Sequence, residues 1–83
     1  MNNLLVDEIH CKIMDSVQEL YDKYGIEPNC LLLSRDIIVK LLRSNRLHLK
    51  YDDSGICIKT YMGIYVKELL EVDIIKAAII LED

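Results

Sequence analysis

The stretch that decides the fold is LHLKYDDSGICIKTYMGIYVK, residues 47–67. Apolar and polar side chains alternate over residues 47–51, and a period of two continues over residues 56–66. Since successive side chains of a strand point to opposite faces, this alternation predicts a β-meander. Between the two runs, the segment DDSG at 52–55 predicts a tight turn, and Gly63 predicts a bend, a bulge or a second turn.

The segment before the meander is helical in pattern. Over residues 4–24, apolar side chains recur at spacings of three and four, which predicts a long amphipathic helix; they include Val6, Ile9, Ile13, Val17 and Leu20. Asn2 or Asn3 is the expected N-cap, and Gly25 is expected to end the helix. Twenty-one residues of helix span roughly 31 Å, about the width of a domain of this size.

Three further elements complete the expected fold. Residues 29–33 form a short apolar run that predicts a buried strand, and Ser34 is the expected N-cap of a second helix that ends near residue 44. For residues 70–82 the sequence leaves helix and strand both open, and we favour a turn or short helix over 70–76 followed by a strand over 77–82. The predicted fold is a single α+β domain over residues 1–83, with both helices packed on a small, mainly antiparallel sheet.

The composition suggests a non-catalytic protein–protein interaction or assembly module, which associates with itself as a dimer or larger oligomer, or with another protein. Hydrophobic residues make up 52% of the 83 residues, without any Trp or Phe. A chain of this length buries only roughly 60–65% of its unfolded surface, so a partner subunit would add to a thin core. We expect self-association along the wide stripe of the first helix, at Leu5, Ile9, Met14, Val17 and Tyr21. The alternative is that this stripe only covers the sheet of its own chain.

The charge is unevenly distributed. The whole chain carries −4, whereas residues 35–50 carry +4, from five basic residues against Asp36. Basic residues spaced along the exposed side of a helix are typical of phosphate contacts. The alternative function is therefore a small nucleic-acid-binding regulator that uses Arg35, Lys40, Arg43, Arg46 and Lys50. A solvated helix face, or ion pairs between proteins, is the simpler interpretation of the same pattern.

The sequence lacks the motifs of catalytic and metal sites. Neither a C-x-x-C nor an H-x₃-H spacing is present, and the glycines do not form a phosphate-binding loop. We therefore expect no enzyme activity, no metal and no cofactor. Three widely spaced cysteines favour reduced thiols and a cytoplasmic location, and no apolar run reaches the roughly 18 residues of a membrane span.

One resemblance concerns residues 29–82. The order is an apolar strand ending in Ser (NCLLLS), a helix (RDIIVKLL), a hairpin, a Tyr-x-Gly-Ile-x-Val step (TYMGIYVKEL) and a closing apolar strand (AIILED). This order is similar to stretches of phage coat-type domains and of small phage-encoded proteins. The resemblance implies a phage or prophage origin and a role in assembly or contact, with virion association as an alternative location. It implies no catalytic residues.

Overall fold

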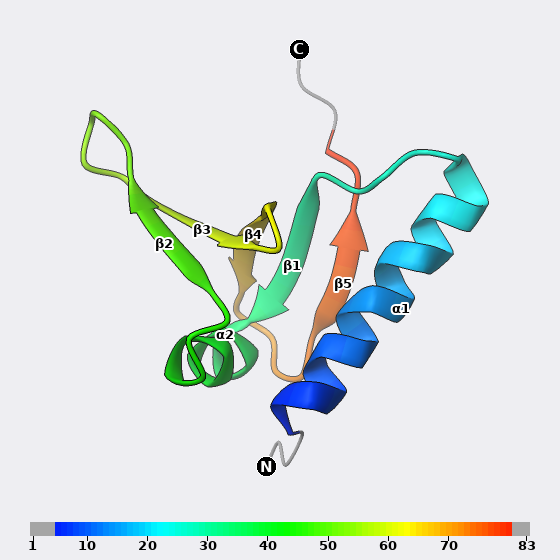
Figure 1. Ribbon diagram of the computed structural model, residues 1–83, viewed down its shortest axis with the longest axis horizontal. Helices are drawn as coiled ribbons and strands as arrows, with labels where there is room; N and C mark the ends of the chain where they lie inside the picture. The colour runs from blue at the N-terminus through cyan, green and yellow to red at the C-terminus, as the bar shows by residue number, and fades with distance from the viewer. Residues whose placement is uncertain (1–4, 81–83) are drawn as a thin grey trace.

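A computed structural model describes residues 5–80, which form two helices and a five-stranded sheet (Figure 1). In chain order the elements are α1 (Val6–Tyr24), β1 (Cys30–Ser34), α2 (Arg35–Arg43), β2 (His48–Tyr51), β3 (Cys57–Tyr61), β4 (Ile64–Leu69) and β5 (Ile75–Ala78). The strands lie in the order β2-β3-β4-β1-β5. Strands β1 and β4 pair in parallel, and the other three pairs are antiparallel. The predicted α+β fold is confirmed.

The pairing register shows that both helices pack on one face of the sheet. Leu31 of β1 pairs with Val66 of β4 and with Ala77 of β5, and directly paired residues share a face. These side chains pack in one core with helix residues Ile9, Ile13, Ile37, Ile38 and Leu41. β1, whose Leu31 and Leu33 are fully buried, is therefore the strand on which the core is built.

The predicted elements are found close to their expected positions. The meander is present as β2, β3 and β4, with its turns at residues 52–56 and at Met62-Gly63. The last strand is also present, but it covers Ile75–Ala78 and not 77–82, and the expected turn or short helix over 70–76 is a bend at 70–73 that leads into the strand. The expected caps Asn2 and Asn3 lie outside the described residues. The N-cap position of α1 is Leu5, without a side-chain hydrogen bond to the helix.

Ser34 occupies the predicted N-cap position of α2, but its hydroxyl does not cap that helix. Its Oγ accepts a hydrogen bond of 3.1 Å from the backbone N–H of Ile74, and its own N–H donates one of 3.1 Å to the Ile74 carbonyl. The predicted position of the cap is therefore correct, but the predicted hydrogen bond from its side chain to the helix is absent. Because Ser34 is fully buried, these two bonds fix the segment that leads into β5.

The two edges of the sheet differ. On the outer edge of β5, the N–H of Ala77 donates a hydrogen bond of 2.8 Å to Ser16 Oγ of α1, which lies alongside this strand (Figure 1). Helix α1 thus covers this edge, a common protection against unwanted strand pairing. At the opposite end of the sheet, the four residues of β2 are exposed, and within residues 5–80 no strand pairs with the outer edge of β2.

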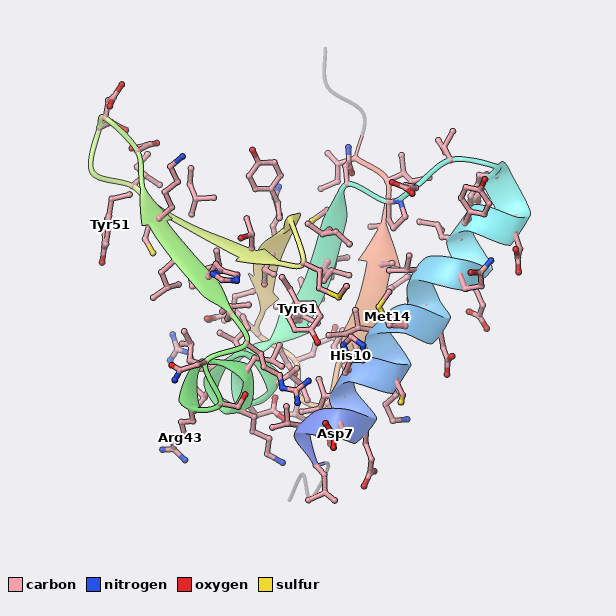
Figure 2. All side chains as sticks on the ribbon, in the orientation of Figure 1. Asp7, His10, Met14, Arg43, Tyr51 and Tyr61 are labelled. Carbon is pink, nitrogen blue, oxygen red and sulfur yellow. The ribbon has the colours of Figure 1, made fainter. Side chains whose placement is uncertain are left out.

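Polar contacts join α1 to the meander on the helix side of the sheet. His10 Nδ1 and the Tyr61 hydroxyl are 2.5 Å apart, and both residues point toward one another in Figure 2. One turn earlier in α1, Asp7 accepts a hydrogen bond of 3.0 Å from the Arg46 guanidinium. Burial raises the pKa of Tyr61, and the neighbouring Arg46 partly offsets that effect. These contacts orient the first half of α1.

The burial of Ile9 gives a test of the core. Ile9 has no exposed surface, so Ile9→Ala should lower the free energy of unfolding by about 3 kcal/mol, the usual range for opening a cavity in a core. Urea denaturation measures this difference. Lys12→Ala, one turn away on the exposed side of α1, is the control and should change stability by less than about 0.5 kcal/mol. An equally small effect at Ile9 would contradict the packing described here.

Candidate functional site

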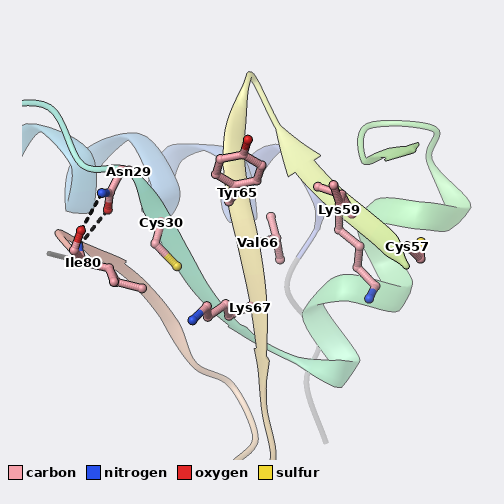
Figure 3. A pocket seen from close by; sticks show the side chains of 9 residues that line it. Asn29, Cys30, Cys57, Lys59, Tyr65, Val66, Lys67 and Ile80 are labelled. Carbon is pink, nitrogen blue, oxygen red and sulfur yellow. Dashed lines mark hydrogen bonds between the residues drawn. The ribbon is translucent and has the colours of Figure 1, made fainter. Parts of the chain in front are cut away.

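The second face of the sheet has no helix over it. In Figure 3 this face is toward the viewer, and the helices lie behind the strands. The register assigns to it the residues that alternate with the core positions; they are His48, Lys50, Ile58, Thr60, Tyr65, Lys67, Leu69, Cys30, Leu32, the buried Ser34, Lys76 and Ala78. We call this set the open face. No helix of residues 5–80 lies over it, although Cys30, one of its members, is only 2% exposed.

A cavity opens on this side of the sheet, and its lining also includes Cys57, Lys59 and Val66, which the register assigns to the helix side. A cavity of about 360 Å³ crosses β3, β4 and β1 and reaches the segment that follows β5. Its lining combines apolar side chains, two thiols and two lysines (Figure 3); the residues are Asn29, Cys30, Cys57, Ile58, Lys59, Tyr65, Val66, Lys67 and Ile80. We call this cavity the hollow. Its volume lies at the lower end of the range of ligand pockets, roughly 300–1,000 Å³.

One side of the hollow is fixed by an amide clamp. The Asn29 side chain donates a hydrogen bond of 2.8 Å to the Ile80 carbonyl and accepts one of 2.8 Å from the Ile80 N–H (Figure 3). These two hydrogen bonds tie the residue before β1 to the segment after β5. Ile80 is thereby held at the rim of the hollow, so the cavity is built by elements that are distant in sequence.

The charge of the open face is positive. Lys50, Lys67 and Lys76 lie on it, and the five strands contain only one carboxylate, Glu68. Glu68 lies on the helix side of β4, where it pairs with Arg35 of α2 at 3.3 Å. The strand positions of the open face therefore carry three lysines and no acid. An apolar centre with lysines around it is suited to a surface that is apolar and acidic.

The hairpin of β2 and β3 extends the site beyond the sheet. Leu47 is buried, as its place on the predicted apolar face requires, but Leu49 and Tyr51 are 49% and 68% exposed. Tyr51 points away from the rest of the molecule in Figure 2. The alternation of the sequence was predicted correctly, but the helices do not reach far enough to cover this end of the strand. Exposed aromatic side chains on such an arm are common in interfaces.

A second cavity of about 570 Å³ lies under this hairpin, and Ile58 and Tyr65 line both cavities. It is more polar, because the turn residues Asp52 and Asp53 contribute to it. Asp52 is engaged within its own turn: hydrogen bonds from the Ser54 hydroxyl and from the N–H groups of Ile56 and Ser54 lower the pKa of its carboxyl. We therefore assign Asp52 to the turn and not to a ligand.

The structure divides the residues that were expected to mediate self-association. Ile9 is fully buried in the core of its own chain, and Val17 packs against that core. Met14 is half-buried. Only Leu5 and Tyr21 expose large parts of their side chains, at opposite ends of α1. The alternative, in which the stripe covers the sheet of its own chain, holds for Ile9 and Val17.

The five basic residues of the segment 35–50 do not form one patch. Arg35 pairs with Glu68, and Arg46 pairs with Asp7. Arg43 points away from the sheet at the end of α2 (Figure 2), on the same helix as Lys40. Lys50 lies on the open face, with the sheet between it and the core. The concentration of charge in the sequence thus corresponds to two separate sides of the molecule.

Residues 5–80 contain no group of three or more His, Cys, Asp or Glu side chains that are placed to hold a metal ion. Within the same residues, no helix has both the length and the apolar character required to cross a membrane. The three thiols are all free, with Cys11 exposed, Cys57 half-buried and Cys30 buried. Burial raises the pKa of Cys30, and the Lys67 ammonium partly offsets this.

Comparisons with known proteins add no assignment: no protein-family model, curated protein or solved structure matches this chain. The site is therefore interpreted from its own geometry and charge.

The thiols allow a test of the geometry of the hollow. Alkylation by iodoacetamide requires the thiolate and access to it, so its rate should fall in the order Cys11, Cys57, Cys30. Peptide mass spectrometry after timed labelling measures the three rates. The same labelling in urea is the control, because the unfolded chain should react at all three positions at similar rates. Labelling of native Cys30 as fast as Cys11 would contradict the buried thiol.

Proposed function

We propose that this protein is a non-catalytic assembly module that associates with further copies of itself through the open face. The observation that supports the proposal is the one-sided coverage of the sheet. It leaves exposed an apolar hollow that has lysines around it. A surface that unites apolar area with charge of one sign is typical of a binding surface. The exposed side chains of the hairpin, Leu49 and Tyr51, extend this surface.

Charge decides which surface of another copy is suited to the open face. Two open faces placed against each other would bring Lys50, Lys67 and Lys76 of both copies together, and like charges in an interface oppose association. The exposed side of α1 has the opposite character. This helix carries five acids and two lysines. We therefore infer association between unlike surfaces, the open face of one copy and the acidic helix of another.

Origin and location belong to the same proposal. The strands of the open face lie within residues 29–82, the region that resembles phage coat-type and small phage-encoded proteins, and an assembly role is what this resemblance implies. The three free thiols support a reducing location, hence the cytoplasm, with association to a virion as the alternative.

The proposal predicts self-association that weakens with salt. Light scattering on a sizing column should give a mass above that of one chain at low salt, and the mass should fall as salt screens the exposed charges. The double variant Lys67→Gln/Lys76→Gln should weaken association about tenfold, since exposed ion pairs contribute roughly 0.2–1 kcal/mol each.

The matched control is Arg35→Gln/Arg43→Gln, which removes the same charge from α2, on the other side of the sheet, and should leave the mass unchanged. A wild-type protein that remains a monomer at high concentration and low salt would overturn the proposal. A monomer that also binds a single-stranded oligonucleotide at low salt, and loses this binding in the lysine variant, would assign the open face to nucleic acid instead.

A further inference from the structure

The C-terminal end of α1 exposes a group of large apolar side chains. Tyr21, Tyr24 and Ile26 are 47%, 56% and 52% exposed. Gly25 ends the helix at a φ of 72°, in the left-handed region, and its N–H donates to the Tyr21 carbonyl at 2.7 Å. The chain therefore turns directly after Tyr24, and Ile26 follows at the end of the helix. Apolar exposure of this kind is costly in water unless another surface covers it.

Acidic residues accompany these apolar side chains. Glu19, Asp22 and Glu27 are exposed within the same nine residues, and the basic residue among them is Lys23, whose ammonium lies 5.3 Å from the centre of the Tyr24 ring. We call the group formed by Tyr21, Tyr24 and Ile26, with its three acids, the helix-end knob. It is apolar and acidic, whereas the hollow is apolar and basic.

We propose that the helix-end knob of one copy enters the hollow of the next copy. Tyr24 and Ile26 would contact the apolar lining at Ile58, Tyr65 and Ile80, and the acids of the knob would lie near Lys67. This inference rests on the proposed function and specifies its partner surface. A central apolar contact surrounded by complementary charges is the usual arrangement of a specific interface.

The proposed contact joins two different surfaces of the same chain. When each copy gives its knob to one neighbour and receives the knob of another, the contact is heterologous: a dimer keeps one free hollow and one free knob, so association continues until a ring closes or a filament grows. A two-fold symmetric interface would stop at the dimer. The two arrangements therefore differ in what happens when a variant without a functional knob meets a variant without a functional hollow.

The experiment uses two variants of the full chain. Lys67→Glu reverses a charge of the hollow and leaves the knob intact, whereas Tyr24→Ser/Ile26→Ser removes the apolar part of the knob and leaves the hollow intact. All three positions are exposed, so both variants should fold, which far-ultraviolet circular dichroism checks. Each variant alone should be monomeric. Their equimolar mixture should form a one-to-one dimer and nothing larger, measured by light scattering.

Leu70→Ser is the control, because Leu70 is 97% exposed and lies outside both surfaces; this variant should associate like the wild type. A Tyr24→Ser/Ile26→Ser variant that still self-associates, while Lys67→Glu does not, would overturn the knob but leave the proposed function in place. A mixture that remains monomeric would likewise exclude the heterologous contact. A monomeric wild type would overturn both proposals.

Discussion

The structure depends on the burial of one strand by two helices that can cover only one side of it. β1 lies inside the sheet, with β4 and β5 on either side, and its Leu31 and Leu33 are fully buried beneath α1 and α2. Within residues 5–80 both helices lie on the same side of the sheet, and no other element lies over the second face. One-sided coverage follows from the topology of these residues, and it leaves accessible the face to which we assign self-association.

The chemistry of the open face distinguishes it from a solvated sheet surface. A sheet with one wet face usually alternates apolar residues inside with polar residues outside. Here Cys30, Leu32 and Ile58 lie on the outer face, together with Tyr65, which is 58% exposed. In the association that we propose, the lysines among them oppose contact between two open faces, since like charges repel. In the same proposal these lysines would face the acidic side of α1 of another copy.

The sequence predicted the elements better than the site. Periods of two and 3.6 residues are local, so the meander, both helices and the last strand were predicted near their positions. The parallel pairing of β1 with β4 is a contact between distant segments that no local pattern encodes, and it decides which residues share a face. For this reason the sequence left open whether Ile9 is buried in its own chain or lies in an interface, and the exposure of Leu49 was not predicted. The alternation of Tyr65 and Lys67 with Val66 in the sequence indicates a strand whose outer face carries both an aromatic ring and a positive charge.

The central claim is that the open face and the C-terminal end of α1 meet in self-association. The most direct test follows backbone amide signals of the isotope-labelled wild-type protein by nuclear magnetic resonance, over a dilution series at low salt. The account predicts concentration-dependent shifts at two separate places, around Tyr65 and Lys67 and around Tyr24 and Ile26, with little change along the exposed side of α2. Signals that do not change with concentration, or that change only along α2, would contradict it.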